Sequence, residues 1–276
     1  MEPKLEGNLI IIGGAEDKKG EKEILKEVCS KLDRENEELV IATVATELPE
    51  EVGKEYTKIF RNLGVKKISI LDIQERDNAF EEKNIDMLKA ASIVFFTGGD
   101  QLKITSLLGG TPLYKVIKDI YKDGCVFVGT SAGASVMSDT MIISGSNDDS
   151  PKKCTVKMAP GLGLIKDVII DQHFAQRGRV GRLLGAIAEN PECLGIGIDE
   201  DTAIEVCDKG YFKVIGSSAV YVIDASNISY TNVSEQNPDE LLSMFNVRMH
   251  VLKCDDKFDL VKRQPFENKE EKNENK

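Results

Sequence analysis

Residues 126–139, VFVGTSAGASVMSD, contain the transition that decides the fold. The run Val-Phe-Val predicts a buried β-strand, and the small residues near the end could begin a helix. Between them lies GTSAG, residues 129–133, which matches the G-x-S-x-G pattern of a nucleophile elbow. Glycine tolerates the tight turn of such an elbow, so the hydroxyl of Ser131 would stand clear of the backbone. Ser131 is therefore a candidate nucleophile, and a purely structural turn is the alternative.

The residues before this stretch repeat the alternation of strand and helix. Short apolar runs predict strands, and apolar residues at helical spacing predict helices. The predicted strands are residues 8–12, 39–44, 67–71 and 92–96, and the predicted helices are 21–34, 50–63, 81–90 and one that begins at Pro112. Buried strands that alternate with amphipathic helices are typical of parallel sheets covered on both faces. We therefore predict an α/β fold, a three-layer αβα sandwich with a mostly parallel, flavodoxin-like sheet.

The second half of the chain contains strand-like runs that are separated in places by only a few residues. These runs are residues 168–171, 194–198, 202–206, 211–215 and 219–223. Short separations predict hairpins, so the sheet should become mixed there. We predict a single α/β domain over residues 1–265, because no repeat or flexible linker interrupts the chain. Residues 266–276, FENKEEKNENK, are predicted to form a disordered charged tail.

Composition excludes several classes of function. The chain has 276 residues and a formal net charge of −11, and such a surface repels nucleic acids and anionic membranes. No apolar run approaches the ~20 residues of a membrane span, and the N-terminal residues lack the pattern of a signal peptide. The six cysteines include no CxxC pair, so free thiols in a reducing cytoplasm fit best. With two histidines far apart in sequence, a His-rich metal site is not expected.

A serine nucleophile needs a base, and the candidates are His173 and His250. His173 follows the strand predicted at residues 168–171, so it should lie at the same sheet edge as Ser131, unless it is a structural histidine. His250 lies in an alternating segment and is interpreted as a strand-surface histidine. The base needs an orienting carboxylate, which any of the successive acids at residues 199–201 could supply. This order of serine, histidine and acid differs from that of ordinary α/β-hydrolases.

Three arginines, Arg177, Arg179 and Arg182, follow the candidate base in an otherwise acidic protein. A solvated cationic helix start would explain them, yet cations are unfavourable at a helix N-terminus. Arginine binds carboxylates through two parallel hydrogen bonds. We therefore favour the hypothesis that they bind a substrate with carboxylate groups.

Two glycine-rich turns are predicted at the same sheet edge. An amide of the pair Gly98 and Gly99 could complete an oxyanion hole with the amide of Ala132, and Gln101 would point into the crevice. Residues 13–17, GGAED, do not match G-x-G-x-x-G, so no dinucleotide is expected there. We interpret them as a structural turn at the rim of the site. A simple turn is also the alternative for residues 97–101.

Several motifs now identify a resemblance. GGAEDK, TGGDQLKITSLLGGTPL, GTSAGASVMSD, DQHFAQRGRVGRL and GIGIDEDTAI occur in this order. Together they resemble cyanophycinases, which belong to a serine peptidase family that also includes the aspartyl dipeptidase peptidase E. The resemblance runs from Gly13 to about Ile223. It implies a cytoplasmic, cofactor-free enzyme, commonly a homodimer, whose fold resembles class I glutamine amidotransferases.

The resemblance also implies a role for individual residues. Ser131 matches the family's nucleophile, His173 its base and Glu200 the acid that orients the base. Gly99 and Ala132 would form the oxyanion hole. The positions that match the family's substrate pocket are Gln101, Asp171, Gln172, Arg177, Arg179 and Arg182.

The implied substrate is cyanophycin, a nitrogen-storage polymer. Its backbone is poly-aspartate, each β-carboxyl carries an arginine, and cyanophycinases release β-Asp-Arg dipeptides. The three arginines fit the free α-carboxylate of each unit, and Asp171 is a candidate partner for its guanidinium. Two other functions remain open: a peptidase E-like dipeptidase that acts on α-linked Asp-X, and a catalytically silent amidotransferase-like binding protein.

Overall fold

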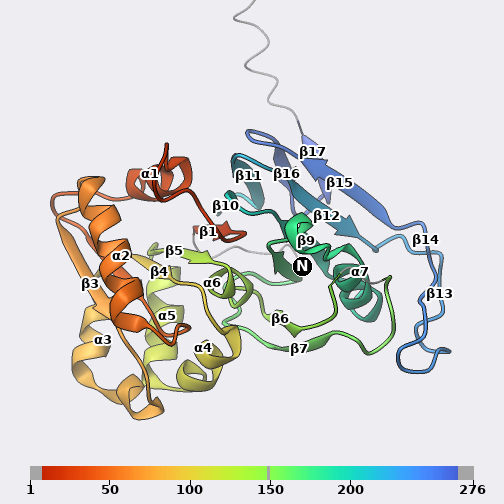
Figure 1. Ribbon diagram of the computed structural model, residues 1–276, viewed down its shortest axis with the longest axis horizontal. Coiled ribbons are helices and arrows are strands. Elements are labelled where there is room, and N and C mark those ends of the chain that lie inside the picture. Colours follow the sequence, from red (N-terminus) through yellow and green to blue (C-terminus); the bar gives the residue numbers. More distant parts are fainter. Residues whose placement is uncertain (1–7, 148–149, 267–276) are drawn as a thin grey trace, which may run out of the picture.

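The computed structural model describes residues 8–147 and 150–266. Its largest sheet has nine strands in the order β17-β16-β11-β10-β1-β5-β4-β2-β3 (Figure 1). The parallel strands are β1 (Leu9–Ile12), β5 (Val126–Thr130), β4 (Ala91–Phe96), β2 (Glu38–Ala42) and β3 (Lys67–Leu71). Antiparallel pairing adds β10 (Thr202–Cys207), β11 (Tyr211–Gly216), β16 (Lys257–Asp259) and β17 (Gln264–Phe266). The predicted α/β class is confirmed.

Side chains of the parallel strands alternate between two apolar cores, one on each face of the sheet. On β1, Leu9 and Ile11 belong to one core, and Ile10 and Ile12 belong to the other. The helices on the Ile10 side are α1 (Glu23–Ser30) and α2 (Pro49–Asn62). Those on the Leu9 side are α3 (Glu82–Lys89), α4 (Gln101–Leu108) and α5 (Pro112–Lys122). This arrangement confirms the predicted three layers.

Side-chain caps fix the start of two helices on the Leu9 side of the sheet. Thr111 precedes α5, and its hydroxyl accepts a hydrogen bond from the amide of Tyr114 at 3.2 Å, with Pro112 in the first turn. Asp100 caps α4 in the same way, through the amide of Leu102 at 2.8 Å. Helix α4 therefore begins directly after the turn that follows β4, and α5 begins after the short connection from α4.

The strand that precedes His173 belongs to a separate four-stranded sheet. Its order is β15 (Arg248–Leu252), β12 (Val220–Asp224), β9 (Leu194–Ile198) and β8 (Val168–Gln172). Helix α7 (Val180–Glu189) packs on this sheet through a third apolar core. The prediction that His173 and Ser131 share one sheet edge is therefore wrong. Periodicity predicts that a strand is buried, but it carries no information about which sheet the strand joins.

Of the short connections after residue 194, the one between β10 and β11 is the predicted hairpin. The connections at residues 199–201 and 217–219 instead lead from one sheet to the other. Asp201 and Gly216 have positive φ angles of 49° and 101°, which permit the sharp changes of direction. The amide of Ser217 donates to the carbonyl of Asp201 at 2.9 Å, so the two connections contact each other.

The remaining elements are short. They are β6 (Thr140–Ser144), β7 (Lys157–Pro160), β13 (Tyr230–Thr231), β14 (Met244–Phe245), helix α6 (Ala132–Ser135) and the 3-10 turns η1 (Arg76–Phe80) and η2 (Ala175–Arg177). Most of these elements were not predicted, because a segment of two to five residues is too short to show a periodic pattern. Helix α1 is also shorter than the predicted residues 21–34. The single-domain boundary at residue 265 stays a prediction, and residues 267–276 of the predicted tail lie outside the described residues.

We predict that Gly197→Ala destabilises the second sheet. A Cβ at this position of β9 would lie 2.4–2.6 Å from ring atoms of the buried Phe174. Overpacking of this kind costs about 1–3 kcal/mol, so the urea unfolding midpoint should fall. Gly185→Ala in α7 is the control, because its Cβ would meet no atom closer than 3.5 Å. The control should match or exceed the parent, and equal midpoints for Gly197→Ala and the parent would contradict this packing.

Candidate active site

Ser131 lies between β5 and α6 in a strained backbone conformation, with φ 54° and ψ −109°. Its amide donates to the carbonyl of Ile12 at 3.1 Å, and its own carbonyl accepts from the amide of Ala134 at 3.0 Å. The glycines of the motif are required for space. A Cβ at Gly129 would lie 2.1 Å from the carbonyl oxygen of Gly133. The turn thus holds two backbone segments in close contact beneath the serine.

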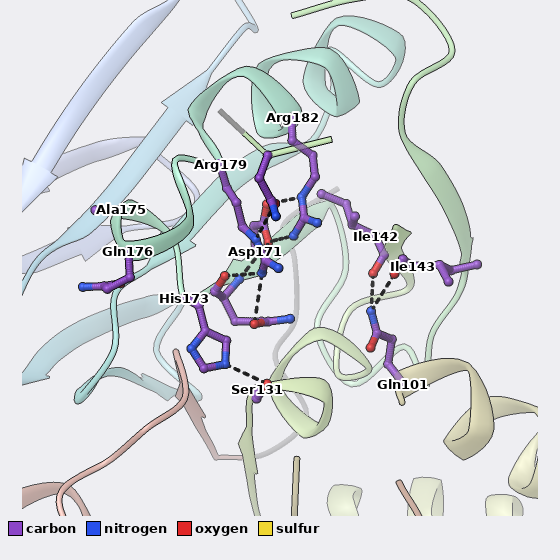
Figure 2. Close-up of polar contacts among 12 residues, drawn as sticks. Gln101, Ser131, Ile142, Ile143, Asp171, His173, Ala175, Gln176, Arg179 and Arg182 are labelled. Atoms are coloured by element: carbon purple, nitrogen blue, oxygen red, sulfur yellow. Dashed lines mark hydrogen bonds and ion pairs between the residues drawn. The ribbon is translucent and has the colours of Figure 1, made fainter. Parts of the chain in front are cut away.

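A chain of hydrogen bonds connects Ser131, His173 and Glu200. The hydroxyl of Ser131 lies 3.0 Å from Nε2 of His173, and Figure 2 shows the two side chains pointing toward each other. On the other side of the ring, Nδ1 lies 2.6 Å from Oε1 of Glu200. His173 is buried, with 8% of its surface exposed. This geometry suits a histidine that takes the proton of a serine while a carboxylate orients the ring.

The turn at Gly13 and Gly14 lies between the two sheets and against the imidazole. The carbonyl of Gly13 accepts from the amide of His173 at 2.8 Å, and that of Gly14 accepts from the amide of Asp201 at 2.9 Å. Gly14 has φ 99°, and a Cβ there would lie 2.4 Å from Cε1 of His173. This turn, interpreted from the sequence as the rim of the site, therefore forms the surface on which the candidate base rests.

The three successive acids have different hydrogen-bond partners. Glu200 is the acid that contacts the imidazole. Asp199 is buried and accepts from the amide of Ala175 at 2.9 Å. Asp201 accepts from the amide of Asp17 at 2.8 Å. Asp199 and Asp201 thus hold backbone segments. Of the three acids that the sequence offered as partners of the base, Glu200 is the one that lies against the imidazole.

The predicted oxyanion positions lie beside the serine. A Cβ at Gly98 would lie 3.4 Å from Cβ of Ser131, so the turn at residues 98–99 borders the hydroxyl. Gly99 has φ 143°, and a Cβ there would lie 2.2 Å from the carbonyl oxygen of Ala45. Ala132 opens α6, where amides of the first turn have no acceptor within the helix. The assignment of Gly99 and Ala132 to an oxyanion hole stays a prediction.

Two of the three arginines are buried around one carboxylate. Arg182 forms a fork with Asp171, with Nε 2.9 Å from Oδ2 and Nη2 against Oδ1 (Figure 2). Nη1 of Arg179 lies 3.4 Å from Asp171 and 3.1 Å from the side-chain oxygen of Gln172. Burial lowers the pKa of Arg179 to about 10, against the attraction of Asp171, so its charge persists at neutral pH. Arg177 is exposed. Two buried guanidinium groups facing one carboxylate leave an excess of positive charge.

Other predicted pocket residues have structural partners as well. Nε2 of Gln101 donates to the carbonyls of Ile142 at 2.8 Å and Ile143 at 3.3 Å, so its amide points toward β6 (Figure 2). Its role toward a substrate stays a prediction. Asn147, which the sequence did not single out, accepts from Nε of Arg179 at 3.2 Å.

Further polar residues near the site were not predicted from the sequence. Gln176 accepts from the amide of Glu200 at 3.1 Å. Glu16, within the GGAED turn, is buried and accepts from the hydroxyl of Thr130 at 2.6 Å and from that of Tyr56. No sequence signal distinguishes these residues from solvated turn residues, because their partners are distant along the chain.

The surroundings of His173 affect its pKa in opposite directions. Burial lowers the pKa of His173 below its ordinary value of 6.5, the hydrogen bond that Nδ1 donates to Glu200 raises it, and the positive charge of Arg177 lowers it again. The net direction is downward, so the imidazole is neutral at pH 7. A neutral imidazole is the form that can accept a proton.

We predict opposite pKa shifts for two substitutions near His173. Arg177→Gln removes a cation and should raise the pKa of His173, whereas Glu200→Gln removes the stabilising carboxylate and should lower it. With two histidines in the chain, NMR titration of their Cε1 protons can follow each ring, and His250 is the internal reference. A parent His173 that titrates above 6.5, or a rise with Glu200→Gln, would contradict this account.

None of the described helices combines the length and hydropathy needed to cross a bilayer. Among residues 8–147 and 150–266, no group of three or more His, Cys, Asp or Glu side chains could hold a metal ion.

Solved structures share the fold. A peptidase from an acI-B1 actinobacterium superposes with a TM-score of 0.60 and 20% identity, covering 90% of this chain and 98% of its own. A putative peptidase E from Listeria monocytogenes gives a TM-score of 0.54 with 18% identity, over 77% of this chain and 99% of its own. At these identities the likeness concerns the fold alone.

Proteins found by sequence similarity have higher identity to this chain than these structures have. Residues 9–215 match Peptidase family S51. The chain is 40% identical over 256 residues to the cyanophycinase of Trichormus variabilis, covering 92% of this chain and 86% of the relative. It is 39% identical over 267 residues to that of Geminocystis herdmanii, covering 96% and 98%. Peptidase E of a Nostoc species is 24% identical over 169 residues, covering 58% and 67%. The chain therefore belongs to peptidase family S51 and is a serine-type peptidase.

Proposed function

We propose that the protein is a cyanophycinase that hydrolyses the poly-aspartate backbone of cyanophycin to β-Asp-Arg dipeptides. The observation that carries the proposal is the hydrogen-bonded chain of Ser131, His173 and Glu200 next to a cluster with excess positive charge. Identity of about 40% to cyanophycinases over 92% of the chain supports the substrate. The silent binding protein is disfavoured, because the serine and the histidine are already within hydrogen-bond reach.

The proposed reaction is acyl transfer through a covalent intermediate. The hydroxyl oxygen of Ser131 forms a bond to the backbone amide carbon while its proton moves to Nε2 of His173. The negative oxygen then lies against the amides of Gly99 and Ala132. The carbon–nitrogen bond breaks, and the leaving amine takes the proton from the imidazole. Water attacks the acyl-enzyme, gives a proton to His173, and releases the product acid as Ser131 regains its hydrogen.

The arginine cluster is proposed to bind the free α-carboxylate of the substrate's arginine. Arg177 is exposed, and Arg179 retains donors beyond those used toward Asp171 and Gln172. Both oxygens of Asp171 already accept from Arg182. We therefore assign to Asp171 the task of orienting the arginines, rather than the binding of the substrate guanidinium. A buried carboxylate that accepts from several guanidinium donors fixes their direction.

A peptidase E-like activity on α-linked Asp-X dipeptides is the second candidate. The similarity to peptidase E covers 58% of this chain and supports the shared reaction class. The three arginines beside His173 favour the polymer, because each of its units presents a carboxylate. We also propose that the enzyme is a cytoplasmic homodimer with one catalytic domain per chain. The six free cysteines support a reducing compartment.

The first prediction for this function concerns the products. The parent chain, incubated with purified cyanophycin, should release β-Asp-Arg, which mass spectrometry identifies. Ser131→Ala should lower the rate by roughly 10⁴-fold or more, because the nucleophile is lost. A fluorophosphonate should label the parent and leave Ser131→Ala unlabelled. Release of free Asp from Asp-X dipeptides, with the polymer intact, would instead favour the peptidase E-like alternative.

The second prediction concerns Arg177. A charge-assisted bond to the substrate carboxylate is worth ~1.5–3 kcal/mol, so Arg177→Ala should lower kcat/KM by roughly 10–150-fold. Arg177→Lys should restore only part, since lysine keeps the charge and loses the fork. Assays at about pH 8 keep His173 neutral in every variant. The buried Arg179 and Arg182 are poorer tests, because their loss leaves Asp171 unpaired.

The matched control for Arg177 is Arg61→Ala, which removes an exposed arginine near the end of α2, a helix that packs on the core containing Ile10 and Ile12. It should retain parental kcat/KM. If Arg177→Ala cleaves the polymer as fast as this control, the carboxylate pocket is misplaced.

A further inference from the structure

We propose that Glu16 is a positioning residue. It fixes the position of the Ser131 elbow relative to the turn at Gly13 and Gly14, which contacts His173. The proposal rests on the serine chemistry proposed above. Glu16 is 4% exposed, and its carboxylate accepts from the hydroxyl of Thr130 at 2.6 Å and from that of Tyr56. Among the described residues, its hydrogen-bond partners are hydroxyl groups, and no cation forms an ion pair with it. A carboxylate is costly to bury in this way.

One end of this connection is the nucleophile. Thr130 directly precedes Ser131, whose backbone is held at φ 54°. Such strain persists only where the surroundings determine the conformation several times over. The amide of Ser131 is bound by Ile12 and its carbonyl by Ala134. The bond from Thr130 to Glu16 fixes the residue before it and adds a side-chain contact to the backbone bonds that define the elbow.

The other end is the candidate base. Glu16 belongs to the same turn as Gly13 and Gly14, whose carbonyls bind the amides of His173 and Asp201. Gly14 also lies against the imidazole ring. Glu16 therefore couples the large sheet, which carries Ser131, to the backbone that supports His173. A shift of this turn relative to the elbow would change the 3.0 Å separation between the hydroxyl and Nε2.

Tyr56 anchors the carboxylate from behind. It lies on α2, and the centroid of its ring is 4.8 Å from that of Phe95. Nζ of Lys18 lies 4.3 Å from the centroid of the Tyr56 ring. Burial, together with the charge of Glu16, raises the pKa of Tyr56 well above its ordinary value, so the phenol remains a donor. The carboxylate is thus held by a rigid aromatic cluster on one side and by the elbow on the other.

The test measures acylation of Ser131 by a fluorophosphonate, which does not depend on the natural substrate. Glu16→Ala should slow labelling and kcat by about 100-fold, because a displacement of about 1 Å has that effect on a reacting pair. KM on cyanophycin should stay within about twofold. Glu16→Gln should recover most of the rate, since the amide can accept one hydroxyl bond and donate to the other oxygen. If Glu16 had only a structural role, its substitution would lower the stability of the protein but would not lower kcat selectively while KM stays unchanged.

Two shape-preserving variants keep the test decisive if Glu16→Ala does not fold. Thr130→Val and Tyr56→Phe each remove one hydroxyl and should slow labelling, and Glu16→Ala combined with Thr130→Val should be no slower than Glu16→Ala alone. Thr111→Val is the control, because at the α4–α5 connection it removes an equally short buried bond, 2.6 Å to the carbonyl of Leu108, together with the cap of α5. Parental labelling by both shape-preserving variants, or losses no larger than in this control, would overturn the proposal.

Failure of the substrate assignment would be seen separately. A parent chain that reacts with the fluorophosphonate but leaves cyanophycin intact contradicts the substrate, and the labelling rates still report on Glu16. A parent chain that does not react contradicts the serine chemistry and, with it, the role of Glu16.

Discussion

The hydrogen bond between Ser131 and His173 joins two different sheets, and the rest of the site is arranged around that constraint. Side chains from separate sheets keep a 3.0 Å contact only if the sheets are fixed to each other near that point. The turn at Gly13 and Gly14 does this with backbone atoms. Gly13 donates to Thr202 of the large sheet and accepts from His173. Because glycine has no side chain, the imidazole can rest directly on this backbone.

Three residues with unfavourable backbone conformations lie near the contact between Ser131 and His173. Ser131, His173 and Asp201 all have positive φ angles, at 54°, 47° and 49°. Each conformation is unfavourable for a residue with a side chain. Each of the three residues also donates its amide hydrogen to a carbonyl of the turn at residues 13–14 or of β1. The fold thus uses the stability of its large core to maintain three unfavourable conformations where their geometry is needed.

The charge distribution of the site differs from that of the whole chain. The net charge is −11, yet Arg177, Arg179 and Arg182 lie beside His173. Asp171 neutralises one of the two buried arginines, which makes their burial possible. A cyanophycin unit carries one guanidinium and one carboxylate and is neutral as a whole. Recognition would therefore depend on local hydrogen bonds rather than on attraction over a distance.

The sequence by itself determined the α/β class, the G-x-S-x-G motif at Ser131 and the arginine-rich segment, because each depends on local periodicity or on a short motif. It also indicated His173 as the candidate base, although the sheet edge assumed for it was wrong. Tertiary structure decided that His173 belongs to a second sheet, that Glu200, the acid indicated by the family resemblance, contacts it, and that Glu16 accepts from Thr130 beside the elbow. Adjacent acids are chemically alike in a sequence. Which one reaches the imidazole depends on the direction of the backbone, and contacts between residues far apart in the chain set that direction.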